Sequence, residues 1–180
     1  MYKNLVGYKS KTQEKNIAWF LSRPKPDRYR GGMPLYCERW LIDLAIEILG
    51  TQSPSILNLF CGMNKYGLRV DIKPEVKPDI CCDAHEFTKH ISVGKFDIVL
   101  ADPPYSDEES KELYGTPKLN YKRWTAECDK VLRDGGLLIV YHKFIVPNPN
   151  PEKYEVVKRV FIGNRTWHLP RVAIFFKKNK

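Results

Sequence analysis

The sequence predicts an α/β domain whose core is a mostly parallel β-sheet. Short segments recur that are apolar almost throughout, as expected of strands that helices bury on both faces. A segment with helical spacing separates two of these strands, which is the pattern of a β–α–β unit. The length of 180 residues fits one domain with a sizeable core.

A first helix is expected to begin near Leu35 and to end at Gly50. Apolar side chains recur there at the spacing of one buried helical stripe: Leu41, Leu44, Ala45, Ile48 and Leu49. A glycine after the last of them is typical of a helix end. This helix should cover one face of the sheet.

Strands and a second helix follow in a regular order. The expected strands cover residues 55–60, 68–72, 79–82, 96–101 and 137–141. The helix before the last of these has apolar residues at helical spacing: Tyr121, Trp124, Cys128, Val131 and Leu132. Residues 154–161 and 172–177 are expected to close the sheet as an antiparallel hairpin.

Residues 1–34 are expected to form an irregular, basic and aromatic arm ahead of a single domain over residues 35–180. Pro24, Pro26 and Pro34 interrupt any regular element there, and lysines and arginines alternate with aromatic residues. Such aromatics stack on unpaired nucleotides in some proteins, and in others they only anchor a segment to the core. Both readings remain open for this arm.

The net charge of +9 is concentrated towards both ends of the sequence, whereas the middle is mildly acidic. This distribution fits a polyanionic partner or simple solubility equally well.

Five cysteines form no Cys-x-x-Cys pair, and the four histidines lack zinc-site spacing, so no metal is expected. Without an apolar run long enough for a membrane span, we expect a cytoplasmic protein that does not bind a membrane.

The sharpest chemical signal is Asp102-Pro103-Pro104-Tyr105, which directly follows the apolar strand 96–101. Ligands of open parallel sheets bind beyond the carboxyl ends of the strands, so these residues should face a site. Asp102 and the Pro103 carbonyl can both accept hydrogen bonds from an amino group. Two such acceptors localise the nitrogen lone pair for attack on a methyl group, and Tyr105 offers a ring on which an extruded base can stack.

These residues resemble the Asp/Asn/Ser-Pro-Pro-aromatic motif of the amino-methyltransferase branch of the Rossmann-like, S-adenosylmethionine-dependent enzymes. The resemblance runs from about Ser55 to Tyr141. It implies a seven-stranded sheet with a reversed last strand, and S-adenosylmethionine as the cofactor. It also implies methyl transfer to an exocyclic amino nitrogen of a nucleic-acid base, with Asp102, Pro103, Pro104 and Tyr105 as the catalytic residues.

The same resemblance implies a cofactor site at the ends of the first three predicted strands. Its first part is Asn58-Leu-Phe60-Cys61-Gly62, which is similar to the loop that approaches the methionine part of the cofactor. Asp71 with Ile72 resembles the acid that accepts the ribose hydroxyls, and Asp83 with Ala84 resembles the adenine contact. Cys61, Cys81 and Cys82 are also expected to be small core residues.

Two features depart from the family pattern. Asn58 replaces the usual acid, and Met63 and Asn64 stand where further glycines are usual. Only nine residues separate Gly62 from Asp71, which is too short for a full helical crossover. A nicotinamide enzyme is disfavoured as well, because Gly-x-Gly-x-x-Gly is missing.

Among substrates, adenine N6 in DNA is the first hypothesis, because tyrosine after Asp-Pro-Pro is common in such enzymes. An RNA amino-methyltransferase (adenine N6 or guanine N2) is the second, and a non-catalytic nucleic-acid-binding subunit with the same fold is the third. Candidate nucleic-acid contacts are Arg28, Arg30, Arg165, Trp167 and Arg171. Little sequence remains after residue 141 for target recognition, so a protein partner could also supply it.

Overall fold

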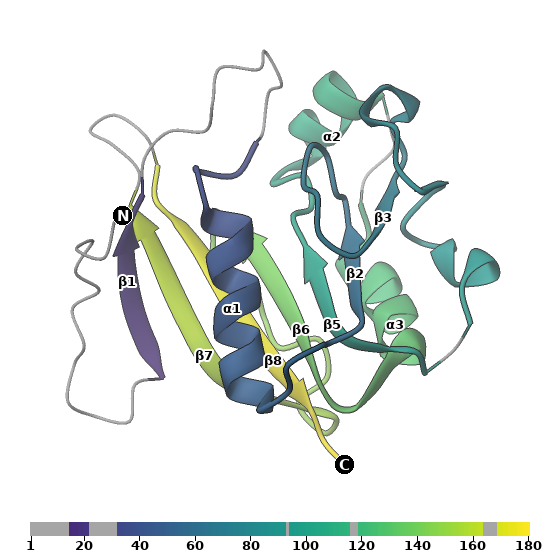
Figure 1. Cartoon of the computed structure of the whole chain (residues 1–180). Helices are drawn as coiled ribbons and strands as arrows, with labels where there is room; N and C mark the ends of the chain where they lie inside the picture. The colour runs from purple at the N-terminus through teal and green to yellow at the C-terminus, as the bar shows by residue number, and fades with distance from the viewer. Residues whose placement is uncertain (1–14, 22–31, 93, 116–118, 164–168) are drawn as a thin grey trace.

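The computed structural model describes residues 15–21, 32–92, 94–115, 119–163 and 169–180. The described residues form one eight-stranded sheet with the order β1-β7-β8-β6-β5-β2-β3-β4 (Figure 1). Its strands are β1 (Asn16–Phe20), β2 (Ile56–Leu59), β3 (Leu68–Asp71), β4 (Ile80–Cys81), β5 (Phe96–Ala101), β6 (Leu132–His142), β7 (Tyr154–Gly163) and β8 (Arg171–Lys178). Every pairing among them is parallel except those of β8, which is antiparallel to both β6 and β7.

The predicted α/β class, parallel sheet and closing hairpin are therefore confirmed, but the strand count is eight rather than seven. The additional strand is β1, in which Asn16 pairs with Arg159 and Phe20 with Gly163. The expectation of an irregular arm is thus wrong for residues 16–20. Their short apolar run, Ile-Ala-Trp-Phe, has basic and proline-rich neighbours, and it becomes a strand because the edge of β7 offers its backbone hydrogen-bonding partners.

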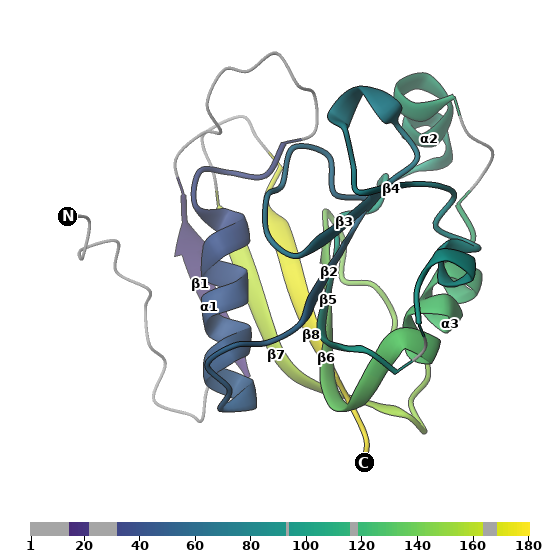
Figure 2. The same cartoon turned by 45° about the vertical axis from the view of Figure 1, so that its right-hand side comes forward.

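Two helices cover opposite faces of the sheet (Figure 2). One face holds α1 (Cys37–Leu49), which ends at Gly50 with a φ of 66°, the left-handed conformation that glycine adopts without strain. The other face holds α3 (Tyr121–Val131), whose Asn120 side chain caps the helix by accepting the N–H of Arg123. Both helices match the predicted apolar spacing, except that Leu132, expected in the second helix, begins β6.

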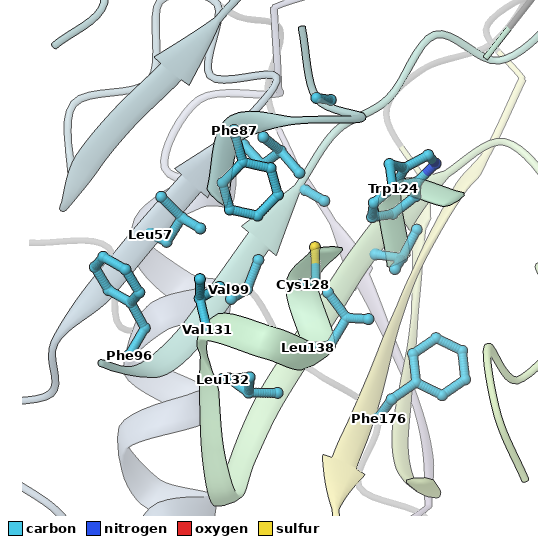
Figure 3. Packing of buried hydrophobic residues seen from close by; sticks show 14 of the residues in the cluster. Leu57, Phe87, Phe96, Val99, Trp124, Cys128, Val131, Leu132, Leu138 and Phe176 are labelled. Carbon is cyan, nitrogen blue, oxygen red and sulfur yellow. The ribbon is translucent and has the colours of Figure 1, made fainter. Parts of the chain in front are cut away.

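The core divides into two layers, one on each face. On the α3 side, Phe87, Trp124 and Cys128 pack with side chains of β2, β5, β6 and β8 (Figure 3). On the α1 side, Leu41 and Ala45 pack against Ile98 and Ile139. Leu21 and Met33 also belong to this second layer, so segments preceding α1 contribute to the core.

The connections on the β2–β3–β4 side are short. A loop without helix joins β2 to β3, and the 3-10 helices η1 (Pro74–Val76) and η2 (Phe87–His90) follow β3 and β4. A further helix, α2 (Asp107–Tyr114), follows β5 at the same end of the sheet as the carboxyl ends of β2 and β3 (Figure 1). The neighbouring parallel strands β2 and β5 connect to opposite sides of the sheet: β2 continues to β3 on one side and β5 to β6 on the other. The carboxyl ends of β2 and β5 therefore define the crevice where open α/β sheets bind ligands.

The cysteines are all free, and their burial corrects one expectation. Cys61 is buried and Cys82 half-buried, but Cys81 is exposed because β4 is the short edge strand of the sheet. No group of three potential metal-ligating side chains occurs among the described residues. No helix in the described part of the chain is long and apolar enough to cross a membrane.

Candidate active site

A pocket lies beyond the carboxyl ends of β2, β3 and β4, with walls from the following loops and from α2. Five of the residues predicted to bind a cofactor line it, together with Pro104 of the Asp-Pro-Pro-Tyr segment. The lining residues are Leu59, Phe60, Val70, Asp71, Ile72, Cys82, Asp83, Ala84, His85, Pro104, Ser110 and Leu119. The pocket is thus largely apolar, with two carboxylates and an imidazole at its wall.

Asp71 is the buried acid of this pocket and lies at the end of β3. Its Oδ2 accepts the N–H of Gly62 at 2.8 Å, and its Oδ1 accepts the N–H of Lys73 at 2.9 Å. The carboxylate therefore holds the loop after β2 against the loop after β3. Each oxygen keeps a further lone pair, so the same group can also accept hydrogen bonds from a ligand hydroxyl.

Asp83 is held by a residue that the sequence did not single out as a ligand contact, His85. The Asp83 Oδ1 accepts the backbone N–H of His85 at 2.8 Å. The same oxygen lies 2.7 Å from the Nδ1 of the His85 ring. The other ring nitrogen, Nε2, accepts the N–H of Asn120 at 3.0 Å. The imidazole therefore links the acid to the start of α3.

The short loop from β2 to β3 turns with three residues of positive φ. Phe60 has a φ of 56°, Gly62 of 47° and Gly67 of 77°. A Cβ on Gly67 would lie 2.5 Å from the Ile56 carbonyl oxygen, so the loop can lie this close to β2 only with glycine at that position. A non-glycine residue in the left-handed region is strained, and Phe60 adopts it at the wall of the pocket.

Glu38, in the first turn of α1, fixes the same loop from the other side. Its Oε1 accepts the N–H of Lys65 and that of Tyr66, each at 3.0 Å. The same oxygen accepts the Asn58 side-chain amide at 2.8 Å. Burial raises the pKa of Glu38, against the opposing effect of these N–H donors. The resemblance implies an acid at position 58. This chain has Asn58 there instead, and its side-chain amide donates to the Glu38 carboxylate of α1.

Asp102 lies directly after β5, and its N–H donates to the carbonyl of Leu59 at 3.4 Å, so the ends of β5 and β2 are joined. The Tyr105 hydroxyl donates to the Asp102 Oδ1 at 2.9 Å. Burial raises the pKa of Asp102 to about 8, although the Tyr105 hydroxyl and the positive charge of Arg171 both lower it. A carboxyl group with such a pKa beside a pocket is a candidate acceptor of a proton or hydrogen bond.

The Tyr105 ring is surrounded by three basic side chains. The Arg171 guanidinium carbon lies 4.8 Å from the ring centroid, and the Lys143 Nζ lies 5.7 Å from it. The His142 ring meets Tyr105 edge-on, with the centroids 5.0 Å apart. Stacking of a base on Tyr105 stays a prediction.

The predicted site residues fall into three groups. Phe60, Asp71, Ile72, Asp83 and Ala84 line the pocket, and Pro104 extends it towards Asp102, Pro103 and Tyr105. Asn58, Cys61 and Gly62 instead hold the loop after β2 in place, because Asn58 and Cys61 are buried and Gly62 binds Asp71. Arg171 lies on Tyr105, whereas Arg28, Arg30, Arg165 and Trp167 lie outside the described residues.

Glu38, Gly67 and His85 are the residues of this site that the sequence interpretation missed. Glu38 lies 27 positions before the loop it binds, and nothing local marks such a contact. Helix α2 was missed as well, although Ser106 and Glu109 have the spacing of a capping box and Ser106 does accept the N–H of Glu109.

Solved methyltransferase structures share this fold. TrmN from Thermus thermophilus superposes with a TM-score of 0.59 at 14% identity, over 83% of this chain and 50% of that protein. The N-methyltransferase NodS from Bradyrhizobium japonicum WM9, in complex with S-adenosylhomocysteine, gives 0.58 at 14% identity, over 87% and 94%. The rRNA methyltransferase aviRa from Streptomyces viridochromogenes gives 0.54 at 10% identity, over 83% and 87%.

The fold and the strand-end pocket together define the class: the chain has the Rossmann-like methyltransferase fold, with a mostly parallel sheet and a C-terminal antiparallel hairpin. This chain spans half the length of TrmN. No protein-family model and no curated protein sequence matches it.

Proposed function

We propose that this protein is an S-adenosylmethionine-dependent methyltransferase that modifies an exocyclic amino nitrogen of a nucleic-acid base. The observation that carries the proposal is the position of Asp102-Pro103-Pro104-Tyr105 at the end of β5, beside a pocket that contains Asp71 and Asp83. Structural neighbours crystallised with S-adenosylhomocysteine, the product of such a transfer, support the choice of cofactor.

The pocket fits S-adenosylmethionine by its chemistry. Asp71 offers carboxylate oxygens for ribose hydroxyls, and Asp83 lies where an adenine amino group could donate to it. The apolar side chains of Phe60, Ile72 and Ala84 suit a flat base. When bound, the cofactor supplies an activated methyl group on a positively charged sulfur.

Asp102 would position and activate the acceptor nitrogen. An amino group conjugated to a base ring is a poor nucleophile, because its lone pair is delocalised into the ring. The Asp102 carboxyl and the Pro103 carbonyl would each accept one of its hydrogens and so localise that lone pair. After transfer, the nitrogen must lose a proton, and the ionised form of Asp102, whose share grows as the pH approaches its pKa of about 8, can accept that proton.

Adenine N6 in DNA is our first substrate hypothesis, since tyrosine follows Asp-Pro-Pro in this chain. RNA is the second, and the rRNA methyltransferase aviRa among the structural neighbours favours it. Both hypotheses share one chemistry, so one experiment can decide between them.

The test incubates the protein with methyl-labelled S-adenosylmethionine and, separately, total DNA and total RNA, and then identifies the labelled nucleoside. We expect label in an N-methylated nucleoside, such as N6-methyldeoxyadenosine. Label in a ring carbon or in a small molecule would contradict the proposal. Cofactor binding without transfer to either polymer would indicate that a partner is required, and absence of binding would favour a non-catalytic subunit.

The matched variant is Asp102→Ala. It should abolish methyl transfer, because the acceptor nitrogen loses the carboxyl group that activates it, but cofactor affinity should stay within a few-fold of the wild type. Calorimetric titration with S-adenosylhomocysteine measures the affinity, and the labelling assay measures transfer. Parallel loss of both would place Asp102 in cofactor binding instead.

A further inference from the structure

A group of exposed apolar side chains lies where β6 ends and β8 begins, next to Tyr105. Phe144 and Ile145, directly after β6, are each 61% exposed, and Leu169, before β8, is 68% exposed. Because His142 pairs with Val172, the residues after His142 and those before Val172 lie at the same end of the neighbouring strands β6 and β8. Neighbouring exposed apolar side chains of this size usually mark a binding surface.

The last residue of β6, His142, fixes the position of Phe144. The His142 Nδ1 accepts the N–H of Phe144 at 3.0 Å, and the two rings lie 5.7 Å apart. Burial lowers the pKa of His142 to about 4, and the neighbouring Lys143 lowers it as well, so the ring is neutral and accepts this bond at neutral pH. The same ring contacts Tyr105, so Phe144 is held at a defined distance from the Asp102 motif.

The charge around Phe144 is positive. The Lys143 Nζ lies 5.5 Å from the centroid of the Phe144 ring and 5.7 Å from that of Tyr105. Arg171 lies on Tyr105 and donates to the carbonyl of Leu169 at 2.7 Å. Glu109 is the carboxylate that faces Lys143, at 3.4 Å, and its other oxygen accepts the N–H of Tyr105. Two cations against one acid, next to an exposed aromatic ring, are complementary to a polyanion that carries flat bases.

We propose that Phe144, with Lys143 beside it and Arg171 on the neighbouring Tyr105 ring, forms the surface that binds a single-stranded polynucleotide next to the target base. The inference rests on the proposed function and deepens it, because it assigns base stacking to Phe144 rather than to the enclosed ring of Tyr105. A nucleotide adjoining the target stacks on Phe144, and Lys143 and Arg171 contact phosphates. Single strands fit this surface because their unpaired bases present faces on which an aromatic ring can stack.

The test measures binding of a fluorescent single-stranded oligonucleotide to Phe144→Ala by anisotropy, in the presence of S-adenosylhomocysteine. We expect affinity to fall about tenfold or more, since one base–aromatic stack is lost. The KM for an oligonucleotide that accepts the methyl group should rise by a similar factor, while kcat stays within about threefold. Phe144→Trp should keep the wild-type affinity, because indole also stacks.

The control is Phe161→Ala, which removes another exposed aromatic ring, on β7. It should bind the oligonucleotide as the wild type does. Wild-type affinity of Phe144→Ala, or equally tight binding of a duplex of the same sequence, would overturn the inference. If Phe144→Ala loses strand binding but the wild-type protein transfers no methyl group, the binding surface stands and the proposed activity fails.

Discussion

Asp102 is a residue kept at a cost to stability. Its pKa in the folded protein is about 8, against an ordinary value of 3.8, so the folded state favours the protonated form. Its contribution to stability is therefore fully present below pH 3.8 and is lost as the pH rises through 8. An acid that lowers the stability of the folded state at neutral pH is expected where the group serves a reaction.

Tyr105→Phe tests whether the ionised form of Asp102 is the active one. Loss of the hydroxyl that donates to Asp102 removes an influence that lowers its pKa, so the pKa should rise above 8. The pH profile of kcat/KM reports groups of the free enzyme, and its rising limb should move to higher pH in the variant. An unchanged limb, or one moved to lower pH, would show that Asp102 does not control the profile.

At the scale of elements, the loop between β2 and β3 replaces a crossover helix. A helix would normally set the distance between these strands and cover them, whereas here the loop is held by Glu38 of α1 and by Asp71 of β3. Loop rigidity thus comes from two carboxylates, of which Asp71 follows the loop closely in sequence and Glu38 precedes it by 27 positions. Such rigidity lowers the entropic cost of ligand binding.

Glu38→Gln should weaken this arrangement. The variant keeps one oxygen for the three donors, but its N–H₂ group replaces the Oε2 that also accepts the N–H of Lys65 at 3.1 Å, and the negative charge of the acceptor is lost. We expect the affinity for S-adenosylhomocysteine to fall by about 1–2 kcal/mol, roughly five- to thirtyfold. The control is Asp43→Asn, the same change on the exposed face of α1, which should leave the affinity unaltered. Equal affinities for both variants would contradict the role of Glu38.

Elements with a local signal could be predicted, and those that depend on distant contacts could not. The apolar stripe of α1, the strand 96–101 and the spacing of Trp124 and Cys128 all mark their elements directly. By contrast, β1 is a strand because β7 pairs with it, and α2 has polar residues almost throughout. The pocket residues were identified because strand ends converge in a parallel sheet, whereas Glu38 and His85 act through contacts across space.

At the scale of the whole molecule, β1 is part of the packed unit. Trp19 of β1 meets Trp40 of α1 edge-on, with the ring centroids 5.7 Å apart, so the strand is joined to the helix as well as to β7. Residues ahead of the predicted domain boundary therefore contribute to the fold.

Trp19→Ala should lower the free energy of unfolding by about 1–3 kcal/mol, because the aromatic contact and part of the buried apolar surface are lost. Urea denaturation followed by circular dichroism measures this change. Phe20→Ala, at a position that is 69% exposed, should shift the free energy by no more than about 0.5 kcal/mol. Equal effects of the two substitutions would show that β1 adds nothing specific through Trp19.

The place of β8 in the sheet has a consequence for the order in which the protein is made. Among the described strands, β7 and β1 reach the rest of the sheet only through β8, the strand that follows them in sequence. On the ribosome, β1 emerges early but must wait for β7, and this pair cannot join β6 until β8 has been synthesised. The sheet is therefore completed late, and substitutions in β8 should reduce the yield of folded protein more than substitutions in the edge strand β4.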